Sequence, residues 1–144
     1  MATKFDGAES ILVAVDGSDS SLRAIAYAAG MARRQTAQLI AVFVHTTGSL
    51  SGLQAEAVAG IVAANHQLAA ELRGQVQQAA QRLDLRATFV ERQGDPAIEI
   101  AKVADALRVD AVVVGASEQV GHRVIGAVGV RLIRHAHWPV TVVP

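Results

Sequence analysis

Two strand-to-loop junctions in this chain carry the residue types that bind phosphate groups. The first is Asp16-Gly17-Ser18, directly after the apolar run 11–15; the second is Gly115, directly after the apolar run 111–114. Gly126 follows the second junction, at the start of a predicted short helix. Glycine lets the backbone approach a ligand closely, and free amides at a helix start favour an anion. Two such junctions in one small domain predict a crevice of nucleotide size.

Composition limits the classes of protein that the chain can belong to. With 144 residues, 51% hydrophobic and 18% charged, it is expected to fold as one globular domain, residues 1–144. Thirteen basic residues balance thirteen acidic ones without a basic run, and aromatic residues make up only 3%. This argues against a nucleic-acid partner. No apolar run approaches the ~20 residues of a spanning helix, and no signal-like segment or cysteine is visible. We therefore expect a cytoplasmic protein with no membrane partner.

Strand-like and helix-like segments alternate along the chain. Short apolar runs predict strands at 11–15, 39–44, 85–93, 111–114 and 140–143. Helical spacing predicts helices from Ser18 or Asp19 onward, at 53–83, from Pro96 to about 107, and at 128–136. This order predicts an α/β fold: a single doubly wound, five-stranded parallel sheet in the order 3-2-1-4-5, with helices on both faces. Strands 1 and 4 are then neighbours, and ligands bind beyond their carboxyl ends.

Several motifs, in this order and spacing, resemble those of the universal stress protein family, the UspA-type domain, over essentially the whole chain. They are Ile11-Leu-Val-Ala-Val-Asp-Gly-Ser18, Gly94-Asp-Pro96, Ala111-Val-Val-Val-Gly115, Gly126-Ala-Val, and Trp138-Pro-Val-Thr-Val-Val143. The resemblance implies a binding and signalling module of the stress response.

Members of that family that bind ATP carry the pattern Gly-x2-Gly-x9-Gly-Ser/Thr, and Gly115 and Gly126 match its first and third glycines. Glu118 stands in place of the middle glycine, the loop is two residues shorter, and Ala127 replaces the hydroxyl that would contact a phosphate. By the same resemblance, Asp16 matches the residue that contacts the nucleoside, and the backbone of Val44 matches the one that contacts adenine. The resemblance thus names ATP, with Mg²⁺ when bound, or another adenine nucleotide as the cofactor. The residues expected at this site are Ala14, Val15, Asp16, Val44, Val114, Gly115, Ser117, His122, Arg123, Gly126, Ala127 and Val128.

A second interpretation needs no nucleotide. The domain would then act by dimerisation and by contact with an unidentified protein partner, and it would bind no cofactor. Glycine would be required at positions 115 and 126 for a positive φ or for close packing, and Asp16 would cap the following helix. Both interpretations stay open at this point.

No catalytic residue and no metal site are predicted. The chain has no Gly-x-Ser-x-Gly elbow, Walker loop or metal-binding His-Glu motif. His135 and His137 are two residues apart near a helix end, so their side chains point in different directions. We therefore expect a binding module and not an enzyme.

The closing strand predicts how two copies would associate. Residues 140–143 are apolar, β-branched and uncharged, and the predicted strand order places them at a sheet edge. An exposed apolar edge invites pairing with another chain, and members of the family commonly dimerise there. We expect a homodimer whose interface includes Trp138, Val140, Thr141, Val142 and Val143.

Overall fold

The computed structural model describes residues 8–46, 50–119, 122–124 and 126–144. Strands and helices alternate along the chain as the sequence predicts, except that two further short strands precede the last helix. The elements are β1 (Ser10–Val15), α1 (Asp19–Gln35), β2 (Gln38–His45), α2 (Ala55–Leu83), β3 (Ala87–Gln93), α3 (Pro96–Ala106), β4 (Ala111–Gly115), β5 (Ser117–Gln119), β6 (His122–Val124), α4 (Ala127–His135) and β7 (Val140–Val143).

Five strands form one parallel sheet in the order β3-β2-β1-β4-β7, which confirms the predicted order 3-2-1-4-5. The register places Val13 beside Ala41 of β2 and Val113 of β4. β1 is therefore the central strand. Strands β2 and β3 lie on one side of it and β4 and β7 on the other, so the order in which successive strands join the sheet reverses between β1 and β4. The antiparallel hairpin β5-β6 was not predicted, because its short polar segments were interpreted as a loop.

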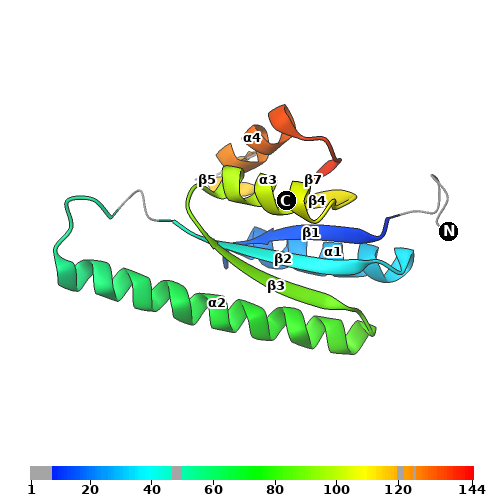
Figure 1. The fold of residues 1–144 in the computed structure, drawn as a ribbon, viewed down its shortest axis with the longest axis horizontal. Coiled ribbons are helices and arrows are strands. Elements are labelled where there is room, and N and C mark those ends of the chain that lie inside the picture. Colours follow the sequence, from blue (N-terminus) through cyan, green and yellow to red (C-terminus); the bar gives the residue numbers. More distant parts are fainter. Residues whose placement is uncertain (1–7, 47–49, 120–121, 125) are drawn as a thin grey trace.

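Helices cover both faces of the sheet (Figure 1). Side chains of successive strand residues point to opposite faces, so the apolar runs supply two cores at once. Val13 and Leu39 join α1 and α2 in one buried cluster. Leu12 and Val112 join α3 and α4 in the other. The described part of the chain contains no helix long and apolar enough to cross a membrane.

The long helix α2 extends past the sheet (Figure 1). Its 29 residues span about 43 Å, whereas the seven residues of its neighbour β3 span only about 23 Å. Its buried residues begin at Ala69, while Ile61 and Val62 remain 38% and 40% exposed. The apolar spacing predicted this helix correctly, but its first turns extend past the sheet (Figure 1), so Ile61 and Val62 are left uncovered.

Candidate functional site

A cleft of about 670 Å³ opens at the carboxyl ends of β1, β2 and β4. Its walls come from the first turns of α1, α3 and α4 and from the middle of α2. The predicted site residues that line it are Ala14, Val15, Asp16, Val44, Val114, Gly115, Gly126, Ala127 and Val128. The reversal of strand order brings these separate segments together, since β1 and β4 are hydrogen-bonded neighbours. Pockets for small molecules commonly have volumes of about 300–1,000 Å³.

The other predicted site residues, Ser117, His122 and Arg123, belong to the β5-β6 hairpin. This hairpin connects Gly115 to Gly126, which both line the cleft. Its backbone register pairs Ser117 with Val124 and His122 with Gln119. The side chains of Ser117, His122 and Arg123 lie outside the described part of the structure, so their contact with a ligand stays a prediction.

A network of serine hydroxyls fixes the turn between β1 and α1. Ser21 Oγ accepts hydrogen bonds from the amides of Asp16 and Gly17, at 3.3 and 3.1 Å. Ser18 is the N-cap of α1 and accepts from the Ser21 amide, whereas Asp16 Oδ1 accepts from the Ser18 amide at 2.9 Å. The interpretation of Asp16 as the helix cap was therefore wrong. Asp16 shapes the turn before the helix, and its side chain is exposed at the cleft.

Gly115 is a glycine because the end of β4 packs directly against the start of α1. A Cβ atom at this position would lie 2.6 Å from the carbonyl carbon of Ser20 and 2.7 Å from the Ser21 amide nitrogen. Beside this contact, Ser20 Oγ donates a 2.6 Å hydrogen bond to the carbonyl of Ala116. Close packing thus explains Gly115. Neither Gly115 nor Gly126, whose φ is −65°, has the positive φ that was the other explanation.

The described part of the cleft lining carries few charges. Among the described residues that line it, Asp16 is the one with an ionisable side chain. α4 has neither a side-chain cap at Gly126 nor an acidic residue in its first turn. Its free N-terminal amides therefore carry uncompensated partial positive charge beside the cleft.

An ion pair at one side of the cleft joins α3 to α4. Asp95 caps α3 by accepting from the Ile98 amide, and its other oxygen accepts from Arg131 Nη1 at 2.8 Å. The hydrogen bond from Arg131, followed by that from Ile98, lowers the pKa of Asp95. Pro96 follows in the first turn of α3, as predicted, and lines the cleft.

Sequence reasoning missed part of the cleft wall. Ser20 and Ser21 could be inferred from the neighbouring junction at Asp16, and Phe43 from the predicted site residue Val44. Asn65 and Leu68 also line the cleft, but they lie mid-way along α2, more than 40 residues from either predicted junction. No local pattern marks them, because only the path of α2 over the sheet brings them there.

The fold and the cleft define a doubly wound parallel α/β domain with a ligand-sized cleft at its topological switch point. Residues 7–144 match the Universal stress protein family, so the chain belongs to that family. This confirms the family that the motifs indicated.

Individual relatives agree with this assignment. A universal stress protein of Methanocaldococcus jannaschii is 29% identical over 136 residues, which cover 92% of this chain and 80% of the relative. The solved UspA from Lactobacillus plantarum superposes with a TM-score of 0.77 at 25% identity, covering 94% of this chain and 97% of that one. A universal stress protein from Archaeoglobus fulgidus, solved in complex with dAMP, has a TM-score of 0.69 at 22% identity, with 94% and 97% covered.

Proposed function

We propose that this universal stress protein is a binding module that holds an adenine nucleotide in the cleft between β1 and β4. The observation that carries the proposal is the convergence of Asp16, Val44, Gly115 and Gly126 on one cleft from four separate segments. Solved proteins with this fold support it, since structures in the family are complexes with cAMP, dAMP and AMP. Its role is binding and signalling, and no described side chain in the cleft is assigned a catalytic part.

A nucleotide with one phosphate fits the cleft better than ATP. The described lining supplies no lysine, arginine or histidine to neutralise a triphosphate, and Asp16 adds a negative charge. The uncapped first turn of α4 offers backbone amides for one phosphate group. The adenine ring has an apolar wall available, which includes Val42, Val44 and Val114. We therefore propose that AMP binds more tightly than ATP and that Mg²⁺ is not required.

Calorimetric titration with AMP, ADP and ATP tests this proposal. We expect saturable binding that is weaker than nanomolar, because the middle glycine, the hydroxyl at position 127 and two loop residues of the family pattern are absent. Asp16→Asn keeps the side-chain oxygen that accepts from Ser18 and removes the charge expected to contact the nucleoside. It should weaken AMP binding about tenfold, since a hydrogen bond to a charged group contributes ~1.5–3 kcal/mol.

Asp19→Asn is the matched control, because Asp19 is exposed in the first turn of α1 and is absent from the cleft lining. It should bind AMP like the unmodified protein. Nanomolar ATP affinity, or no heat with any of the nucleotides at millimolar concentration, would contradict the proposal. The second result would favour the nucleotide-free interpretation.

We also propose that two copies pair through β7, which is an edge strand of the sheet. The carbonyl of Pro139 accepts a hydrogen bond from Val112 of β4, and that of Val143 accepts one from Ala116, which directly follows β4. Because backbone groups alternate sides along a strand, those of Val140 and Val142 face the open edge. Two copies that paired there in antiparallel fashion would satisfy these groups. Trp138 lies mostly inside its own protomer, since it is 9% exposed and donates to Asp105 of α3.

Val142→Pro tests this interface. Proline removes the outward amide of Val142 and leaves the hydrogen bonds to β4 in place. Val142→Ala is the control, because it loses the same packing against the α3 and α4 core but keeps the amide. We expect a dimer for the unmodified protein and for Val142→Ala at micromolar concentration, and a monomer for Val142→Pro, by light scattering. A monomeric unmodified protein, or a dimer that persists in Val142→Pro, would exclude this interface.

A further inference from the structure

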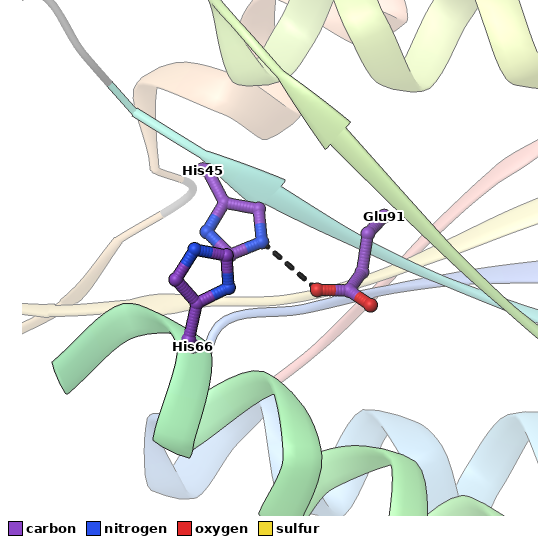
Figure 2. Close-up of side chains that lie close together, drawn as sticks. All are labelled: His45, His66 and Glu91. Carbon is purple, nitrogen blue, oxygen red and sulfur yellow. Dashed lines mark hydrogen bonds and ion pairs between the residues drawn. The ribbon is translucent and has the colours of Figure 1, made fainter. Parts of the chain in front are cut away.

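A second group of chemically active side chains lies beside the cleft, between the ends of β2 and β3 and the middle of α2. His45 is the last residue of β2, Glu91 lies on β3, and His66 reaches toward them from α2 (Figure 2). One ligand atom from each of these three residues lies within 4.8 Å of the others. None of the three lines the nucleotide cleft.

We propose that His45, His66 and Glu91 bind a divalent transition-metal ion, with Zn²⁺ as the preferred ion. Two imidazoles and one carboxylate are a ligand set typical of zinc sites that keep a fourth position open. Mg²⁺ and Ca²⁺ are not expected, because they prefer oxygen ligands. This inference is independent of the nucleotide.

The spacing of the ligand atoms requires only a small closure. In a tetrahedral zinc site with bonds of about 2.1 Å, ligand atoms lie ~3.4 Å apart. His45 Nε2 and Glu91 Oε1 are already 3.0 Å apart. The rings of His45 and His66 have centroids 5.1 Å apart. His66 is exposed on the surface of α2, so it is the ligand with room to move inward.

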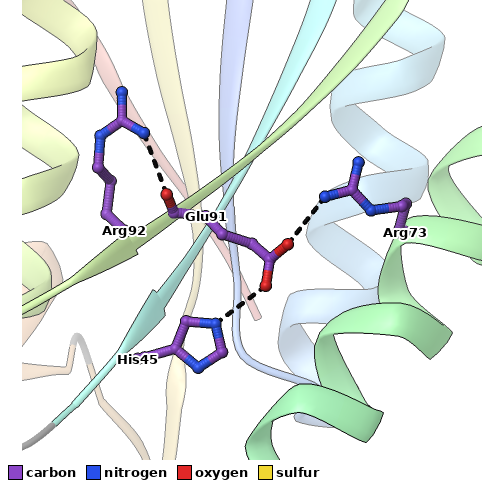
Figure 3. Close-up of polar contacts among 4 residues, drawn as sticks. All are labelled: His45, Arg73, Glu91 and Arg92. Atoms are coloured by element: carbon purple, nitrogen blue, oxygen red, sulfur yellow. Dashed lines mark hydrogen bonds and ion pairs between the residues drawn. The ribbon is translucent and has the colours of Figure 1, made fainter.

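The other two ligands are held in place by their neighbours. The ring of His45 is 17% exposed and packs edge-on against Phe43, with the ring centroids 4.8 Å apart. Arg73 donates to Glu91 Oε2 at 2.8 Å, which leaves Oε1 facing His45 (Figure 3). Hydrogen bonds from His45 and then Arg73 lower the pKa of Glu91, so this group is a carboxylate at neutral pH. Contacts of this kind orient metal ligands in known sites.

Two features of the cluster set the expected strength of binding. The carboxylate can only accept a hydrogen bond, so His45 Nε2 carries a proton in this arrangement. That proton must move to Nδ1, with loss of the hydrogen bond to Glu91, before Nε2 can bind a metal. The positive charge of Arg73 opposes a nearby cation. We therefore expect micromolar affinity for Zn²⁺, below that of dedicated structural zinc sites.

Titration of chelator-treated protein with ZnCl₂, followed by calorimetry, tests the proposal without any nucleotide present. We expect one Zn²⁺ per chain and, with Co²⁺ as the probe, the visible absorption of a tetrahedral site. His66→Asn should weaken Zn²⁺ binding at least about tenfold and leave the fold intact, because His66 is exposed. Glu91→Gln should weaken it similarly, and circular dichroism would show whether either variant has kept its fold.

His135→Ala is the matched control, since His135 is an exposed histidine at the end of α4. It should bind Zn²⁺ like the unmodified protein. The proposal is overturned if no Zn²⁺ binds at millimolar concentration. The polar contacts of the cluster would then serve only to hold α2 against β3. It is also overturned if Zn²⁺ binding survives both His66→Asn and Glu91→Gln, or if His135→Ala abolishes it.

Discussion

Gly115→Ala is expected to destabilise the protein by about 3 kcal/mol, at the upper end of the usual cost of overpacking. The added Cβ would lie 2.6–2.7 Å from backbone atoms of Ser20 and Ser21, which cannot rotate away as a side-chain tip could. β4 cannot move aside either, because β1 and β7 pair with it on its two sides. Separating β4 from α1 would also break the hydrogen bond from Ser20 Oγ to Ala116. Urea unfolding followed by circular dichroism measures the change.

Gly60→Ala is the control for this substitution. Gly60 lies in α2, and a Cβ there would meet no atom within 4 Å beyond its chain neighbours and the backbone of its own helix. Alanine should therefore stabilise the helix, by up to about 1 kcal/mol. If Gly115→Ala unfolds at the same urea concentration as the unmodified protein, then β4 and α1 are not in close contact, and the cleft has a different shape at Gly115.

Ala127→Ser is expected to strengthen AMP binding about tenfold or more. Ala127 is the first residue of α4, is exposed, and lines the cleft. In the family pattern this position carries the hydroxyl that contacts a phosphate. Restoring one hydrogen bond to a charged phosphate should contribute ~1.5–3 kcal/mol, which corresponds to roughly 10–150-fold in affinity. Calorimetric titration of the variant with AMP gives the ratio.

Ala55→Ser controls for a general effect of serine at a helix start. Ala55 is the first residue of α2, exposed, and outside the cleft lining. Its AMP affinity should equal that of the unmodified protein. An Ala127→Ser variant with unchanged affinity would mean that the phosphate does not lie at the start of α4.

The topology was predictable because each helix and each strand of the five-stranded sheet has its own signal in the sequence. Buried runs such as 11–15 and 111–114 must be covered on both faces, and alternation with helices then requires a parallel sheet. Once β1 and β4 are neighbours, the positions of Asp16 and Gly115 at the cleft follow. The β5-β6 hairpin was missed because strands of three residues carry too short a pattern to recognise.

The His45–His66–Glu91 group could not be found in the same way. His45 and Glu91 are 46 residues apart, and only the register of β2 with β3, which pairs Phe43 with Glu91, places them together. His66 joins them because α2 packs over this part of the sheet. The histidines that sequence spacing did single out, His135 and His137, are not part of the group.

The most direct test of the central claim is a nuclear magnetic resonance titration of the unmodified protein with AMP. We expect saturable shifts of the amide signals of Asp16, Val44, Gly115 and Ala127, which lie on separate segments around one cleft. The exposed first turns of α2, including Ile61 and Val62, should show none. Shifts confined to α2, or no saturable shift at millimolar AMP, would contradict nucleotide binding in this cleft.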